Sequence, residues 1–291
     1  MAELYKIDKT TELGSVTLNV ENLTNMCTYY EEVIGLDVLN QSDKRVELGT
    51  EENQKVLLTL VKEEVQGTPT KKAGLFHTAF LLPSRKDLGN VLYSYLSREI
   101  PIGGASDHGY SEALYLQDPE GNDIEIYADK PKEEWDIQPD GTIPGITIQM
   151  DANGVIESRD EGQIDKFPAG TVIGHVHLSV SNLEATHEFY VDVLGLDLKY
   201  NYGDQAKFLA AGEYHHHVGA NTWAGENVPK REETDLGLRS YSFVVPNDQA
   251  LKNVEANLEK LDMQFTEEVS GAISLFDPNG VKVIVEAASQ K

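Results

Sequence analysis

Hydrophobic and polar residues alternate in several short segments of the first half of the chain, as they do in strands with one buried face. After the first such segment, apolar and aromatic residues continue at helical spacing as far as Val33. Asn22 is a side chain of the kind that caps a helix N-terminus, and Gly35 is suited to end the same helix. The pattern predicts strands at 13–20, 45–48, 55–61, 76–82, 112–117 and 123–127, and helices at 23–33 and 85–98.

The second half of the chain repeats this pattern, and the repeat is the strongest sign of its organisation. The chain therefore holds four units, each of one strand, one helix and three strands. The first unit resembles the third, and the second resembles the fourth. The corresponding segments are GSVTLNVENL (14–23) and GHVHLSVSNL (174–183), YYEEVIGLDVL (29–39) and FYVDVLGLDLK (189–199), FHTAFLLP (76–83) and RSYSFVVP (239–246), and LQDPEGNDIEI (116–126) and LFDPNGVKVIV (275–285).

The four units predict an α+β fold in which βαβββ modules, in two tandem pairs, form curved mixed sheets around a cavity. Polar residues at 62–74 connect the first two modules. A stretch rich in Asp, Glu, Pro and Gly separates the two pairs, and we expect it to be a long linker with one strand at most. The expected boundaries are 1–128 for the N-terminal pair (modules at about 12–62 and 75–128), 129–170 for the linker, and 171–291 for the C-terminal pair (modules at about 171–224 and 238–288).

Composition narrows the class of protein. The chain has 291 residues, 40% of them hydrophobic and 25% charged, which is typical of globular domains. Its formal net charge of −25 argues against binding to nucleic acid or to anionic membranes, which requires a basic surface. A single cysteine, Cys27, excludes an intramolecular disulfide and fits a reducing cytoplasm. We find no signal peptide and no apolar run of membrane-spanning length, and the oligomeric state, a homo-oligomer included, stays open.

The repeat also allows candidate ligands to be compared between units. The second unit holds one histidine and one glutamate, and the third unit holds one histidine, at positions where the matching unit of the repeat has another residue. The first and fourth units therefore lack all three candidate ligands. The equivalent positions are His77 and Ser240, Ser15 and His175, and Glu125 and Ile284. A lone histidine on a strand is usually a core or surface residue, and a glutamate that alternates with isoleucines can face water. Their joint loss elsewhere instead favours one metal site made by His77, Glu125 and His175 across the second and third units.

Two imidazoles and one carboxylate, with other coordination positions left open, are typical of non-haem Fe(II) oxygen chemistry. A run of three histidines, His215 to His217, lies in the same unit as His175. If this run is a strand, His215 and His217 share one face and His216 takes the other. The run can equally be a polar surface strand. His177 shares a strand face with His175, so it can line the same cavity or form a hydrogen bond near it.

One segment is specific enough to indicate a family. HGYSEALYLQDPEGNDIEIY (108–127) resembles the signature of type I extradiol ring-cleaving dioxygenases of the vicinal oxygen chelate superfamily. The whole chain except the linker is similar to bacterial catechol 2,3-dioxygenases built from four such units. The roles that this resemblance implies are Fe(II) ligation by His77, Glu125 and His175, acid–base catalysis by His217 of the H-x-x-A motif at 217–220, and hydrogen bonds from His108 and Tyr115 to the substrate oxygens.

The resemblance implies insertion of dioxygen into a catechol-type substrate, a small aromatic diol, to give a ring-opened semialdehyde. The ligand types do not distinguish Fe(II) from Mn(II), and the ring substituents stay open. Two features depart from the family pattern: many members take all three ligands from their C-terminal half, and the spacing from His108 to Tyr115 is shorter by about two residues. The alternatives are a glyoxalase-I-like metal-dependent isomerase and a non-enzymatic protein of the same superfamily that binds a small molecule.

Overall fold

The computed structural model describes residues 4–64, 71–160 and 165–289, so part of the expected connector at 62–74 and part of the linker lie outside the described residues. None of the described helices is both long and apolar enough to cross a membrane. The helices are α1 (Leu23–Tyr29), α2 (Arg85–Ser97), α3 (Ala152–Glu157), α4 (Leu183–His187), α5 (Asp248–Lys260), the π-helices η1 (Tyr30–Ile34) and η3 (Glu188–Val193), and the 3₁₀-helix η2 (Lys132–Glu134). The strands are β1 (Glu12–Val20), β2 (Asp37–Gln41), β3 (Arg45–Thr50), β4 (Lys55–Lys62), β5 (Gly74–Leu81), β6 (Gly104–Asp107), β7 (Ser111–Gln117), β8 (Asp123–Asp129), β9 (Ile148–Gln149), β10 (Val172–Ser179), β11 (Asp197–Tyr202), β12 (Ala206–Ala210), β13 (Val218–Asn221), β14 (Gly237–Val245), β15 (Thr266–Glu267), β16 (Ile273–Phe276) and β17 (Lys282–Ala287).

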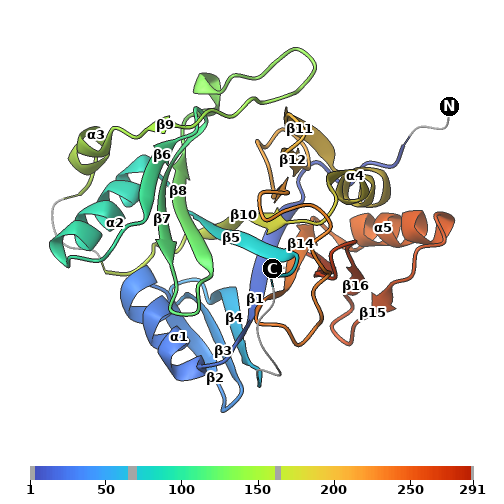
Figure 1. Cartoon of the computed structure of the whole chain (residues 1–291), viewed down its shortest axis with the longest axis horizontal. Helices are drawn as coiled ribbons and strands as arrows, with labels where there is room; N and C mark the ends of the chain where they lie inside the picture. The colour runs from blue at the N-terminus through green and yellow to red at the C-terminus, as the bar shows by residue number, and fades with distance from the viewer. Residues whose placement is uncertain (1–3, 65–70, 161–164, 290–291) are drawn as a thin grey trace.

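The strands of the described residues form two sheets, and each sheet combines strands from both halves of the chain (Figure 1). One has eight strands in the order β15-β16-β17-β14-β1-β4-β3-β2, and the other has nine in the order β11-β12-β13-β10-β5-β8-β7-β6-β9. The first unit therefore pairs with the fourth, and the second pairs with the third. Both sheets mix parallel and antiparallel pairs, so the predicted α+β fold of mixed sheets is confirmed. The division of the chain into halves does not coincide with its division into sheets.

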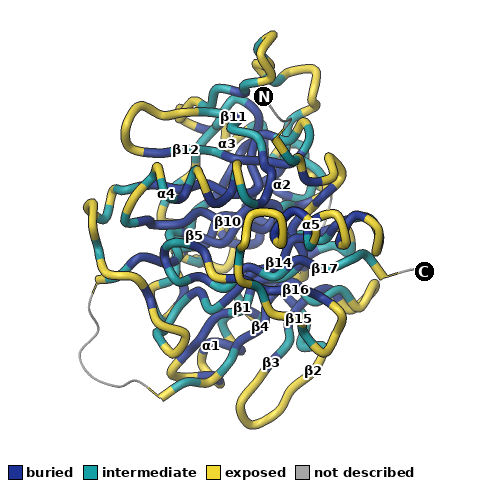
Figure 2. The backbone as a smooth tube through the Cα atoms, turned by 90° about the vertical axis from the view of Figure 1, so that its right-hand side faces the viewer, coloured by how far each residue is buried: buried dark blue, intermediate teal, exposed yellow. Residues whose placement is uncertain are grey.

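The two halves join along two antiparallel ladders, β1 with β14 and β5 with β10. Most residues of these four strands are buried, because the strands lie at the centre of their sheets. Figure 2 shows this buried central layer, with exposed backbone concentrated in the outer loops. Phe80 of β5, Val176 of β10 and Phe243 of β14 are fully buried, and burial of each such side chain stabilises the fold by about 1.5–3 kcal/mol.

The helices cover the outside of the sheets and begin at the caps that the sequence indicates. The side chain of Asn22 accepts a hydrogen bond from the backbone N–H of Asn25, and Asn182 caps α4 in the same way. The predicted helix at 23–33 continues after α1 as the π-helix η1, which ends at Gly35 with φ of 96°. That positive φ favours glycine. The strand β2, which the sequence pattern did not indicate, lies at a sheet edge, where partial exposure weakens the alternation.

Among its described residues, the segment at 129–170 holds one strand, the number that we expected at most, together with helix α3, which we did not predict. β9 extends the nine-stranded sheet by pairing antiparallel with β6. α3 packs against α2 so closely that a Cβ atom at Gly89 would lie 2.3 Å from the carbonyl oxygen of Val155. The segment is therefore part of the sheet and of the packing around it.

Candidate metal centre

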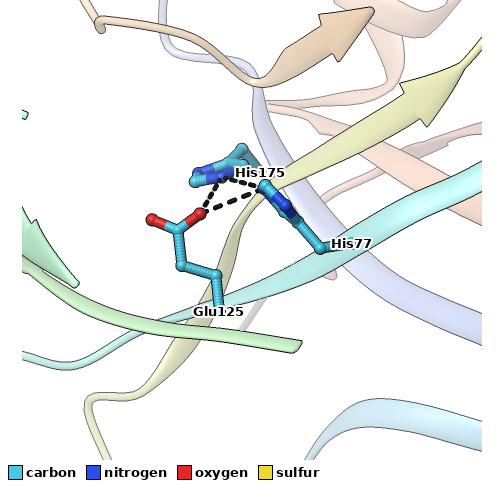
Figure 3. Close-up of side chains that lie close together, drawn as sticks. All are labelled: His77, Glu125 and His175. Atoms are coloured by element: carbon cyan, nitrogen blue, oxygen red, sulfur yellow. Dashed lines mark hydrogen bonds and ion pairs between the residues drawn. The ribbon is translucent and has the colours of Figure 1, made fainter. Parts of the chain in front are cut away.

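His77, Glu125 and His175 meet inside the nine-stranded sheet, and each comes from a different strand (Figure 3). Ala79 on β5 is in register with Glu125 on β8 and with His175 on β10. His77 lies two residues before Ala79, so all three side chains project from one face of the sheet. Their ligand atoms lie within 4.8 Å of one another, and all three residues are buried. The structure thus brings the three predicted ligands together across the second and third units.

The three side chains meet through the atoms that would bind a metal ion. The Oε2 atom of Glu125 lies 3.0 Å from Nε2 of His77 and 3.2 Å from Nε2 of His175. The two Nε2 atoms lie 3.1 Å apart. One carboxylate and two imidazoles that converge in this way are a donor set for a divalent first-row metal such as Fe(II) or Mn(II). The residues present therefore fit the metal that the sequence pattern predicts.

Burial and mutual contact set the protonation of the cluster. Burial raises the pKa of the Glu125 carboxyl, but the adjoining imidazoles of His175 and His77 outweigh this effect and hold the pKa well below its usual range. Burial lowers the pKa of His175 to about 4, although Glu125 acts in the opposite direction. At neutral pH the cluster therefore offers an ionised carboxylate and an unprotonated His175 imidazole, the forms that bind a metal ion.

The three residues line a cavity of about 780 Å³, which is in the usual range for small-molecule sites. Its wall is largely aromatic, and the half-exposed side chain of Trp223 forms part of it. Residues 145–147, which come from the segment between the two module pairs, also line the cavity. The remaining aromatic wall residues are Phe76, Tyr110, Tyr115, Tyr200, Tyr202 and Phe208.

Tyr115 and His108 lie together in the same cavity, on the side of β6 and β7. The Nδ1 atom of His108 lies 2.9 Å from the carbonyl oxygen of Ile146, which can only accept, so Nδ1 carries the proton. The Nε2 atom of His108 then accepts the Tyr115 hydroxyl hydrogen at 2.6 Å. Burial, followed by the charge of Glu125, raises the pKa of Tyr115, so its hydroxyl keeps its proton at neutral pH.

Comparison with known proteins identifies the family. Residues 12–126 and 172–285 match the description Glyoxalase/Bleomycin resistance protein/Dioxygenase superfamily. The chain belongs to that superfamily. The resemblance found in the sequence is thereby confirmed, and the two matched stretches correspond to the two tandem pairs of modules.

Individual relatives within this superfamily and among solved structures agree with the assignment. A catechol-2,3-dioxygenase of Bacillus subtilis (strain 168) is 39% identical over 278 residues, which cover 94% of this chain and 96% of that protein. The crystal structure of glyoxalase I from Zea mays superimposes with a TM-score of 0.56 at 16% identity, covering 95% of this chain and 92% of that one. The cppA protein from Streptococcus pneumoniae TIGR4 gives a TM-score of 0.56 at 14% identity, covering 98% and 100%. At such low identity these two structures show the fold alone.

His217, to which the superfamily resemblance assigned acid–base catalysis, does not line the metal cavity. It lies in the bend before β13, its Nδ1 accepts a hydrogen bond from the backbone N–H of Ala211, and it lines a different cavity beside Trp135. Strand alternation does not apply to the three histidines, because β13 begins only at Val218. His216 lines the metal cavity instead, with its ring centroid 4.2 Å from that of His175. The structure therefore places His216, and not His217, on the metal cavity, and the catalytic role of His217 stays a prediction from the resemblance.

His177, which the sequence left undecided, also lines the metal cavity. Its buried ring lies 5.0 Å from the ring of Phe76 and 5.6 Å from that of Trp223. Across the ladder, a Cβ atom at Gly219 would lie 2.8 Å from the His177 ring, so only glycine leaves the ring its present place. His177 therefore belongs to the aromatic wall of the cavity.

Proposed function

We propose that the protein is an extradiol ring-cleaving dioxygenase that holds Fe(II) on His77, Glu125 and His175 and cleaves a catechol-type diol with dioxygen. The observation that carries this proposal is the His–His–carboxylate cluster in the wall of a large cavity that is otherwise lined mainly by aromatic side chains. The 39% identical relative named as a catechol-2,3-dioxygenase supports the same reaction. When bound, the iron would bring the diol and dioxygen together and stabilise the negative charge that develops on them.

Residues around the cluster would orient the substrate and move its protons. Tyr115 presents a hydroxyl that is held by His108, so it can bind a substrate oxygen in one orientation. His216 lines the same cavity, where its imidazole can accept a substrate proton and return it later in the reaction. The aromatic wall would sandwich a flat ring and exclude water from it.

The chemistry of the cluster favours this reaction over an isomerase of the glyoxalase type. Isomerase sites usually add a fourth protein ligand, often a glutamate from the other module. Among the described residues, the converging ligand atoms come from two histidines and one glutamate only. A metal held by these three residues would keep coordination positions free for a diol and dioxygen.

Oxygen consumption tests the proposal directly. Purified protein would be loaded anaerobically with Fe(II), mixed with catechol, and exposed to air in an oxygen electrode. We expect oxygen uptake together with a yellow ring-opened product, in a ratio of one oxygen to one catechol. Metal-loaded protein that consumes no oxygen with catechol or with alkyl-substituted and aryl-substituted catechols would exclude the proposed reaction. Loading with Mn(II) in parallel would show which metal supports it.

A further inference from the structure

A chain of hydrogen bonds leads from His216 away from the cavity to a carboxylate. The Nδ1 atoms of His216 and His215 lie 2.7 Å apart. The Nε2 atom of His215 lies 3.0 Å from Oδ1 of Asp129, the last residue of β8. Two adjacent histidines and one aspartate are thus connected in series, and only the first of them lines the metal cavity.

The acceptor at the far end fixes the direction of every hydrogen bond in this series. A carboxylate only accepts, so the proton lies on Nε2 of His215. Nδ1 of His215 then has a lone pair and accepts the proton carried by Nδ1 of His216. The Nε2 atom of His216 is left unprotonated, and among the described residues it has no hydrogen-bonding partner in the protein. His216 is thereby held in the tautomer that can accept a proton through Nε2.

Packing holds His215 in the position that this series requires. Its side chain is completely buried, and its ring stacks on Tyr110 with centroids 4.2 Å apart and an interplanar angle of 11°. The ring centroid of Tyr214 lies 4.1 Å from that of His215, and the ring centroid of Trp135 lies 5.2 Å from it. A ring enclosed by three aromatic side chains cannot turn over easily, so the two nitrogens of His215 keep their separate partners.

The hydrogen-bonded series and the metal cluster both include a residue of β8. The first and fourth units lack the residues of both. Glu125 and Asp129 lie four residues apart on β8, so they project from the same face. In the first and fourth units, Lys55, Val56 and Ala288 occupy the positions of His215, His216 and Asp129. The pair of units without metal ligands therefore also lacks every member of the series.

We propose that Asp129 and His215 are positioning residues that keep His216 in the proton-accepting tautomer toward the cavity. The inference rests on the proposed function, because it assumes that His216 moves a substrate proton. Substitution of Asp129 or His215 would slow the chemical step and leave the metal ligands and the cavity wall in place. Removing the carboxylate end should therefore change turnover more than substrate binding.

Two variants test the positioning role of Asp129 and His215 by enzyme kinetics. His215→Phe keeps the aromatic stack but removes both nitrogens, and Asp129→Asn offers a side chain that can donate as well as accept, which permits the opposite direction of both hydrogen bonds. For both we expect kcat for catechol to fall by about 10-fold to 100-fold, with iron content and KM within about twofold of wild type. Glu213→Gln, which removes an exposed carboxylate that pairs with Lys132 near the same bend, is the matched control and should retain wild-type kcat. Retention of wild-type kcat by His215→Phe would overturn the proposal.

A second readout does not depend on turnover. Nitrogen-15 spectra of histidine-labelled, metal-free, full-length protein distinguish protonated from unprotonated ring nitrogens. We expect His216 to carry its proton on Nδ1 in the wild type and to show a mixture of tautomers in Asp129→Asn. A wild-type His216 with its proton on Nε2 would refute this positioning role even if the enzyme is active. A wild type with the expected tautomer but no ring cleavage would instead refute the proposed function, so the two failures are distinguishable.

Discussion

At the scale of single residues, the site depends on Glu125, which contacts both histidines of the cluster through one oxygen atom. We predict that Glu125→Gln and His175→Ala each weaken Fe(II) binding by at least about 100-fold, because each removes one of three ligands and the amide carries no charge. Anaerobic Fe(II) titration with equilibrium dialysis measures this. His187→Ala in helix α4, outside the cluster, should bind iron like the wild type. Full iron occupancy in both site variants would rule out this cluster as the metal site.

A second prediction at this scale concerns His217 and pH. Burial, followed by the nearby His215 and His175, lowers the pKa of His217 to about 3. Below pH 6.5, the ordinary histidine pKa, the unfolded chain binds a proton here and the folded protein does not, so stability is lost as pH falls from 6.5 toward 3. His217→Gln keeps an acceptor for Ala211 without this titration. Between pH 6.5 and 5, urea unfolding of the metal-free variant should lose about 2 kcal/mol less than the wild type. Equal losses of unfolding free energy in the variant and the wild type would contradict the lowered pKa of His217.

Some residues of the site could be predicted from the sequence, and others could not. Comparison of repeats located His77, Glu125 and His175, because a ligand set leaves a pattern of joint presence and absence. It did not separate His216 from His217. That choice depends on the path of a bend, where neither helical nor strand periodicity applies. Asp129 had no sequence signal of its own, because the predicted strand ended at residue 127, whereas β8 continues to Asp129.

At the scale of elements, close contact between β10 and β13 shapes the cavity wall. Gly219 on β13 lies opposite His177 on β10. We predict that Gly219→Ala displaces the His177 ring, because a Cβ atom would lie 2.8 Å from it, and raises KM for catechol severalfold without loss of iron. Gly104→Ala on β6 is the control, since its Cβ atom would lie 3.9 Å from Tyr115 in ordinary contact. Steady-state kinetics on both variants would test this prediction. An unchanged KM in Gly219→Ala would show that the His177 ring can move without affecting substrate binding.

Elements with strong periodicity were predictable, and those formed by tertiary contact were not. Strands β1 and β5 and helix α2 lie within two residues of their predicted limits. The edge strand β2 and helix α3 escaped prediction, since β2 is half exposed and α3 is stabilised by packing on α2. The π-helix η1 has the composition of an ordinary helix. The backbone N–H groups of Gly35 and Leu36, which follow it, both donate to the carbonyl of Tyr30, and no residue pattern indicates this.

At the scale of the whole molecule, the metal site exists only because the two halves share a sheet. His77 and Glu125 come from the first half and His175 from the second. The ladder between β5 and β10 sets them in register, and the ladder between β1 and β14 joins the halves a second time. The sequence indicated this cross-pairing only through the complementary loss of ligands, because the hydrophobic patterns of all four units are nearly alike. The scaffold pair of units has kept the fold and has no residue of the site.

Separating the halves is therefore expected to abolish the site without changing any of its residues. We predict that fragments 1–160 and 161–291, produced alone, bind Fe(II) at least about 100-fold more weakly than the intact chain, since neither holds all three ligands. Each fragment also exposes two apolar strands that the other normally covers, so equimolar mixing should restore both association and iron binding. A mixture in which the fragment 161–291 carries His175→Ala should associate but bind little iron, which separates sheet formation from ligation. Full iron binding by fragment 1–160 alone would show that His175 is not required, and the site would then belong to one half of the chain.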